Sequence, residues 1–161
     1  MNLSTEEAVK LFNIRKIPVD NIVVEFPIHG EAIEIELKSD DGRYLFQADV
    51  NRKFPYNNTK TTYQLRYSKA FQIRRLDFNG GHENPPGPAP ATELVKYEGM
   101  KFVNKSHVHI YIEEWGARWA IPLEDLPELN IFEADDLYER MEKFFKYCNI
   151  ESYKVTKVLL L

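Results

Sequence analysis

Alternating apolar and polar residues mark several stretches of this chain as β-strands. Between residues 31 and 38 (EAIEIELK), three apolar side chains alternate with charged ones. Because successive side chains of a strand point to opposite faces, this stretch predicts a half-buried antiparallel strand. Residues 39–42 (SDDG) predict a turn in which Gly42 can adopt a positive φ, and residues 43–50 predict the second arm of a hairpin.

The same kind of pattern recurs along the rest of the chain. Tyrosine and phenylalanine are frequent between residues 54 and 71, which favours strand over helix there. Together with the hairpin, the pattern predicts a curved antiparallel sheet of about seven or eight strands. The further expected strands are residues 20–26, 61–67, 71–78, 94–97, 100–103, 107–113, 117–121 and 152–160.

A helix is predicted near each end of the chain. Ser4 and Glu7 form a capping-box pattern, so residues 4–14 predict an N-terminal helix. Residues 133–148 carry a longer helical stripe with acidic residues at its start. The fold class is therefore α+β, in one globular domain over residues 1–161. The stripe consists of Leu137, Tyr138, Met141, Phe144, Phe145 and Cys148.

Composition and charge narrow the possible functions. The chain has 161 residues, of which 43% are hydrophobic, enough for one core. Lysine and arginine number 21 against 25 aspartates and glutamates, a net charge of −4. This charge argues against direct nucleic-acid binding and suits a basic protein partner. No apolar run approaches the roughly 20 residues that span a membrane. A single cysteine and no signal pattern predict a cytoplasmic protein.

The histidine-rich stretch of residues 74–113 carries the main candidate chemistry. It holds three of the four histidines. His107 and His109 share one face of the predicted strand 107–113, about 6.5–7 Å apart. Two imidazoles at this spacing can bind one metal ion through bonds of roughly 2.0–2.1 Å.

Two further residues supply the remaining donors of this site. Asp77 ends the predicted strand 71–78, and His82 lies on the glycine- and proline-rich loop that follows. If strands 71–78 and 107–113 are neighbours, all four groups converge. Three imidazoles and one carboxylate suit zinc. We therefore predict a site for one zinc ion with the ligands Asp77, His82, His107 and His109.

Alternatives exist for several of these residues. Glu113 has the parity of the two strand histidines and can replace Asp77, and water can be the fourth ligand. The histidines can also be a simple polar stripe on an exposed strand. Arg75 either faces a phosphate beside the metal or forms an ordinary ion pair. Tyr111 either donates a proton, covers the metal or packs in the core.

Familiar catalytic motifs are missing from the sequence. It contains no Gly-x-Ser-x-Gly elbow, no Walker loop and no His-Glu-x-x-His helix. Cys148 lies on the apolar helix stripe, where a reactive thiolate is not expected. Four protein ligands would close the coordination shell, whereas metal catalysis needs an open position. These features favour a structural metal over an enzyme, with Asp77 as a base remaining an alternative.

Three motifs resemble a known group of proteins. They are R-x-D-x-N-G-x-H-x-N-P (residues 75–85), H-x-H-x-Y (residues 107–111) and R-W-A-x-P-L (residues 118–123). The chain resembles a family of small proteins, without assigned function, from phages and mobile elements of Firmicutes. Among such proteins it is similar to metal-containing anti-CRISPR inhibitors. That resemblance implies a protein in the bacterial host cytoplasm that binds the RNA-guided DNA endonuclease of a type II system and blocks target-DNA loading.

Two classes of function therefore remain in view. The first is a zinc-stabilised inhibitor whose acidic face, including Glu31, Glu34 and Glu36, contacts a CRISPR effector nuclease. The second is a metal-dependent hydrolase, such as a nuclease that acts as a toxin or defence effector, with Arg75 and His82 holding phosphate. A metal-free accessory protein is a third possibility. The number of protein ligands discriminates the first two, since four favour the inhibitor and three plus water favour the hydrolase.

Overall fold

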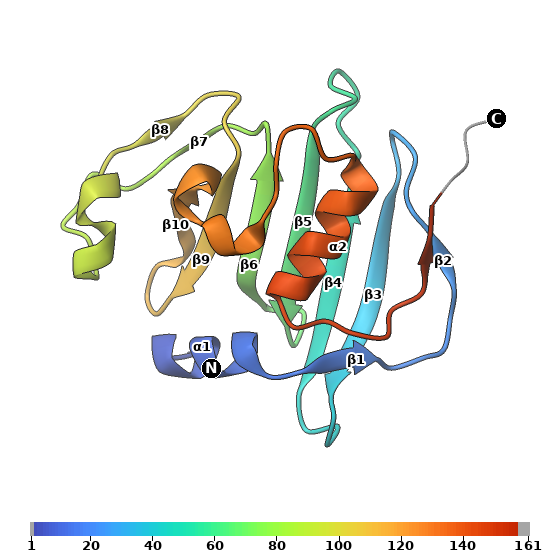
Figure 1. Cartoon of the computed structure of the whole chain (residues 1–161). Helices are drawn as coiled ribbons and strands as arrows, with labels where there is room; N and C mark the ends of the chain where they lie inside the picture. Colours follow the sequence, from blue (N-terminus) through green and yellow to red (C-terminus); the bar gives the residue numbers. More distant parts are fainter. Residues whose placement is uncertain (1, 158–161) are drawn as a thin grey trace.

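A seven-stranded antiparallel sheet lies at the centre of the structure, a computed structural model that describes residues 2–157 (Figure 1). Its strand order is β1-β3-β4-β5-β6-β9-β10. A helix precedes the sheet and another follows it, so the predicted α+β fold is confirmed. The strands are β1 (Lys16–Pro18), β3 (Ala32–Ser39), β4 (Leu45–Asn51), β5 (Thr61–Tyr67), β6 (Phe71–Phe78), β9 (His107–Ile112) and β10 (Gly116–Pro122).

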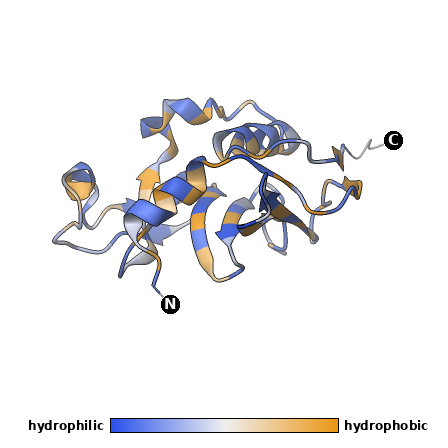
Figure 2. Cartoon of the chain, turned by 90° about the horizontal axis from the view of Figure 1, so that it is seen from below, coloured by the Kyte–Doolittle hydropathy of each residue, from blue (hydrophilic) through white to orange (hydrophobic). Residues whose placement is uncertain are grey.

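The alternation of apolar and polar residues predicted the bounds of the central strands accurately. The predicted strands 61–67 and 71–78 coincide with β5 and β6. In β5, Tyr63 and Leu65 are fully buried while Gln64 between them is half-buried. Figure 2 shows orange and blue bands along strands of the sheet, where hydrophobic and hydrophilic residues alternate. Alternation is therefore a reliable guide where one face of a strand meets the core.

The predictions near the two ends of the chain were less accurate. The strand predicted at residues 20–26 is wrong in extent, because β1 precedes it and only β2 (Val24–Glu25) falls inside it. β2 pairs in parallel with β11 (Val155–Thr156), apart from the main sheet. The predicted strand 152–160 is shorter than expected within the described residues, and its end lies outside them. Such short pairings depend on distant partners rather than on local pattern.

Both helices begin with a capping box. In α1 (Thr5–Asn13), Ser4 accepts a hydrogen bond from the Glu7 amide and the Glu7 carboxylate accepts one from Ser4. α2 (Leu137–Tyr147) begins later than the predicted residue 133, because Asp136 is the capping residue. No helix in the described part of the chain is long and apolar enough to cross a membrane.

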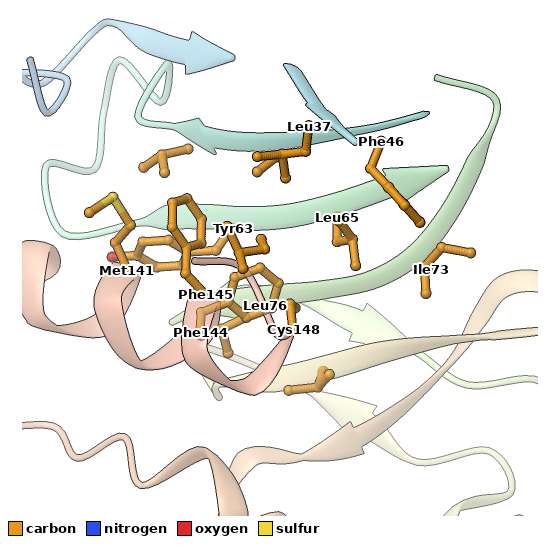
Figure 3. Close-up of a cluster of buried hydrophobic side chains, with 14 of the residues drawn as sticks. Leu37, Phe46, Tyr63, Leu65, Ile73, Leu76, Met141, Phe144, Phe145 and Cys148 are labelled. Atoms are coloured by element: carbon orange, nitrogen blue, oxygen red, sulfur yellow. The ribbon is translucent and has the colours of Figure 1, made fainter. Parts of the chain in front are cut away.

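The main core lies between α2 and one face of the sheet (Figures 1 and 3). Met141, Phe144, Phe145 and Cys148 are fully buried there, as the helical stripe predicted. They pack with sheet residues such as Tyr63. Each such apolar side chain contributes about 1.5–3 kcal/mol of burial free energy.

The opposite face of the sheet is polar. Cross-strand register places Asp49, Gln64, Arg75 and His109 in one row over β4, β5, β6 and β9. A second row consists of Thr62, Asp77 and His107, which lie on β5, β6 and β9, respectively. The candidate metal ligands therefore belong to the polar face, away from α2.

A segment that we call the arm, residues 82–102, projects beyond β10 (Figure 1). It contains β7 (His82–Glu83), paired with β8 (Lys101–Phe102), and η1 (Thr92–Tyr97). The predicted strand 94–97 is wrong, because this stretch is a 3₁₀ helix. Its turns bring Leu94 and Tyr97, three residues apart, to one side, where both are buried with Trp119 in a second apolar cluster.

Candidate metal centre

Strand pairing brings three of the predicted ligands together. β6 and β9 are antiparallel neighbours, with Asp77 opposite His107 and Arg75 opposite His109. This confirms the pairing on which the prediction depended. Side chains at these positions point to the same face, so the carboxylate of Asp77 meets both imidazoles.

The donor atoms of Asp77, His107 and His109 all lie within 4.8 Å of one another. Oδ2 of Asp77 is 3.4 Å from Nε2 of His107 and 3.2 Å from Nε2 of His109. The three residues are only 7%, 0% and 2% exposed, respectively. A carboxylate and two imidazoles this deeply buried need a specific electrostatic partner.

Backbone contacts determine which nitrogen of each histidine carries a hydrogen. Nδ1 of His107 lies 2.7 Å from the carbonyl oxygen of Lys105, and Nδ1 of His109 lies 2.8 Å from that of Ala117. A carbonyl oxygen can only accept, so each Nδ1 is the donor. In the neutral imidazoles both Nε2 lone pairs therefore face Asp77, as in metal sites whose second ring nitrogen is held by a carbonyl.

With both imidazoles neutral, three hydrogen-bond acceptors face one another: the Nε2 atoms of His107 and His109 and Oδ2 of Asp77. Two imidazole lone pairs and a carboxylate oxygen repel unless a cation or an additional proton lies among them. Nε2 of His107 is buried and has no hydrogen-bond partner within residues 2–157. The distances of 3.2 and 3.4 Å are close to the edge of a tetrahedron with zinc–ligand bonds of roughly 2.0–2.1 Å, about 3.3–3.4 Å. The three side chains therefore form a donor set that can hold a metal ion.

Asp77 is held as a carboxylate by its other neighbours. Burial by itself raises the pKa of Asp77, but the imidazoles of His107 and His109, when a proton on Nε2 lets them donate to the carboxylate, and the charge of Arg75 together lower it below its usual range. Thr62 donates to Oδ1 at 3.0 Å, whereas Oδ2 faces the two histidines and Arg75. An ionised carboxylate is the form that binds metal.

His82, the fourth predicted ligand, lies beside this group but outside it. Its ring centroid is 4.5 Å from that of His109. Its Nε2 donates toward the side-chain oxygen of Asn84 and the carbonyl of Arg118, both at 3.0 Å. Burial lowers the pKa of the His82 imidazole, and the adjacent histidines add to this effect. Three donors therefore converge, and because Nε2 of His82 is occupied, its Nδ1 is the atom through which His82 can act as a further ligand.

A family model covers nearly the whole chain around this centre. The matching model is described as Family of unknown function (DUF6978), and it matches residues 3–150. The chain belongs to the DUF6978 family. Searches of curated proteins and of solved structures found no match. The family assignment thus includes the sheet, both helices and the arm, and it assigns no chemistry to them.

Other candidate residues of this DUF6978 protein lie away from the converging donors. The Tyr111 hydroxyl donates to the carbonyl of Leu3 at 2.8 Å, and its ring packs on the main core. Glu113 is exposed past the end of β9, and its amide donates to Thr5. Tyr111 therefore has a packing role, and Glu113 is not one of the three residues whose donors converge.

The residue that sequence reasoning missed is Asn84. It is 2% exposed and connects the arm to the free edge of β10. Its oxygen accepts from the Ala120 amide at 2.9 Å, and its nitrogen donates to the carbonyls of Ala120 at 2.8 Å and Tyr97 at 3.1 Å. An asparagine before a proline suggests only a turn, so the sequence carries no signal for this role.

Proposed function

We propose that this protein binds one zinc ion through Asp77, His107 and His109 and acts as a metal-stabilised binding protein. The observation that supports this most is the inward orientation of two imidazole Nε2 atoms toward one carboxylate oxygen, at 3.2 and 3.4 Å. A structural ion in this position would add its binding free energy to folding. The deep burial of all three donors also favours a structural role over chemistry on a substrate.

The metal would act on the arm because the site touches both of its ends. His82, at the start of the arm, packs edge-on against His109. His107 is bonded to Lys105, shortly after the arm ends, and the Lys105 amide donates to the carbonyl of Gly80 at 3.2 Å. Zinc binding would therefore hold the arm in one position on the sheet, with His82 Nδ1 or water completing the shell.

The finer proposal concerns the partner. We propose an anti-CRISPR role, in which the protein binds a type II RNA-guided endonuclease and blocks target-DNA loading. Its support is the sequence resemblance together with the net charge of −4. Glu31, Glu34 and Glu36 are exposed, although Arg66 and Lys69 lie 3.9 and 3.2 Å from the carboxylates of Glu34 and Glu36, respectively. An acidic surface can occupy a groove that holds nucleic acid.

Elemental analysis combined with an inhibition assay tests this proposal. The purified protein should contain one zinc per chain, and His107→Ala should contain little. His29→Ala is the matched control, because His29 lies in an exposed loop bonded to Phe54 and should leave zinc content unchanged. Inhibition of DNA cleavage by a type II endonuclease should fall with zinc content. If the wild-type protein contained no zinc, the proposed metal site would be wrong. If it did not inhibit the endonuclease, the proposed partner would be wrong.

A second candidate is a metal-dependent hydrolase. The observation that favours it is that three protein donors converge among the described residues, while Arg75 lies beside them with its side chain 31% exposed. A metal ion with an open position would supply Lewis-acid activation of water, and Arg75 would orient a phosphate. Purified protein with zinc, manganese or magnesium should then cleave RNA or DNA. If the wild-type protein cleaved no more RNA or DNA than His107→Ala does, this candidate would be excluded.

A further inference from the structure

The guanidinium of Arg75 contacts two of the three atoms that would bind the metal. Its Nη2 lies 2.8 Å from Oδ2 of Asp77 and 3.1 Å from Nε2 of His109. Its Nε lies 3.1 Å from the same Asp77 oxygen. Arg75 thus supplies positive charge to the buried acceptors, while Nε2 of His107 has no hydrogen-bond partner in the described part of the chain.

These contacts are incompatible with a metal ion on the same atoms. With Nδ1 of His109 donating to Ala117, its Nε2 has one lone pair. That lone pair accepts a hydrogen from Arg75 or binds a metal, and cannot do both. The guanidinium also stays positively charged at all physiological pH values, so it repels a divalent cation.

The surroundings of Arg75 give it a path out of the site. Its side chain is 31% exposed, whereas those of His107 and His109 are 0% and 2% exposed. It reaches the acceptors from the polar face of the sheet, where Gln72 also lies 3.4 Å from Nη1. Withdrawal toward this face requires only rotation of a long side chain and no change in the strand.

We propose that Arg75 is a built-in competitor for the metal position, and that zinc binding releases its guanidinium onto the polar face of the sheet. This inference rests on the proposed zinc site and adds regulation to it. The protein has two forms: one with the Arg75–Asp77 ion pair, and one with zinc and a free Arg75. Only the second form presents an unpaired guanidinium beside Gln64 and Gln72, where a partner's carboxylate or phosphate can meet it.

Zinc affinity measured by competition with a chromophoric chelator tests this inference. Arg75→Gln should bind zinc at least about tenfold more tightly than the wild-type protein, equivalent to about 1.4 kcal/mol. Arg66→Gln is the matched control, because Arg66 lies on the same face and makes an ion pair with Asp49 at 2.9 Å. Its zinc affinity should equal that of the wild-type protein.

A second measurement uses the unsubstituted protein and so does not depend on the folding of a variant. The Nε–H of Arg75 should give a hydrogen-bonded NMR signal that is lost on addition of one equivalent of zinc, while the Nε–H signal of Arg66 persists. An unchanged Arg75 signal with zinc bound, or equal or weaker zinc affinity in Arg75→Gln, would overturn the competitor role alone. Absence of zinc binding in both proteins would overturn this inference and the proposed function together. Binding by Arg75→Gln only would support the inference.

Discussion

The side chain of Asn84 pairs with both backbone groups of Ala120, as a neighbouring strand would. The amide of Ala120 donates to Oδ1 at 2.9 Å and its carbonyl accepts from Nδ2 at 2.8 Å. Within the described residues, β10 is the last strand of the sheet on this side. Asn84 therefore satisfies part of an edge that would otherwise be open, and fixes the arm there.

Loss of this pairing should detach the arm. We expect Asn84→Ala to lower the free energy of unfolding by about 2–3 kcal/mol, because the amide and the carbonyl of Ala120 both lose their Asn84 partner. Limited proteolysis should then cut first within residues 82–102. Asn58→Ala, in an exposed loop, is the control and should change neither quantity. Equal protease resistance of Asn84→Ala and wild type would contradict the anchoring role.

Two adjacent glycines offer a sharp test of close packing at the site. A Cβ on Gly80 would lie 3.0 Å from Cβ of Asp77 and 3.4 Å from Cε1 of His107, whereas a Cβ on Gly81 would be 3.6 Å from the Phe102 carbonyl. Gly80→Ala should therefore cost about 1–3 kcal/mol of stability and reduce zinc affinity. Gly81→Ala should be nearly neutral in both measurements. Thermal denaturation measures the stability of Gly80→Ala and Gly81→Ala, and zinc titration measures their zinc affinity. Equal results for the two variants would contradict the close packing at Gly80.

Substitution of His82 should define its part in metal binding. Its Nε2 is already bonded to Asn84 and Arg118, and its donors lie outside the converging group. We expect His82→Ala to retain one zinc per chain, with affinity reduced by roughly 10- to 100-fold, as for residues that support a site. Mass spectrometry under native conditions measures the stoichiometry. Complete loss of zinc, as in His107→Ala, would instead make His82 an obligatory ligand.

Lys16 joins the ends of the two helices and should give the stability a pH dependence. Its side chain is buried, and burial lowers the pKa of Lys16 from 10.5 to about 8. The ammonium donates to the carbonyls of Phe12 at 2.7 Å and of Ile14 and Cys148 at 2.8 Å.

The sign of this dependence follows from proton binding. Between pH 8 and 10.5 the unfolded chain holds the Lys16 proton more tightly than the folded chain, so the contribution of Lys16 to the free energy of unfolding rises with pH. The free energy of unfolding of wild type minus that of Lys16→Met should therefore rise from pH 8 to 10.5. Cys148, whose pKa burial raises to about 12, acts in the opposite direction in both proteins. Urea denaturation at several pH values measures this, and a constant difference would contradict it.

The sequence by itself determined the strands of the sheet centre and one face of the site. Alternation over residues 61–67 and 71–78 is local, because each strand residue reports the face on which it lies. The same rule placed His107 and His109 on one side, and only one assumption, the pairing of their strand with that of Asp77, was needed to bring the donors together.

Only the tertiary structure decided how the rest of the site is arranged. The arm's path depends on a buried asparagine and an apolar cluster with Trp119, and these contacts form between residues far apart in the chain. Because the arm follows this path, His82 lies beside the converging donors of Asp77, His107 and His109 and not among them. Arg75 and Asp77 are two residues apart on one strand, but the pairing of β6 with β9 placed Arg75 on His109. A period of two in the sequence specifies a face, but distances between side chains from different elements are set by how those elements pack.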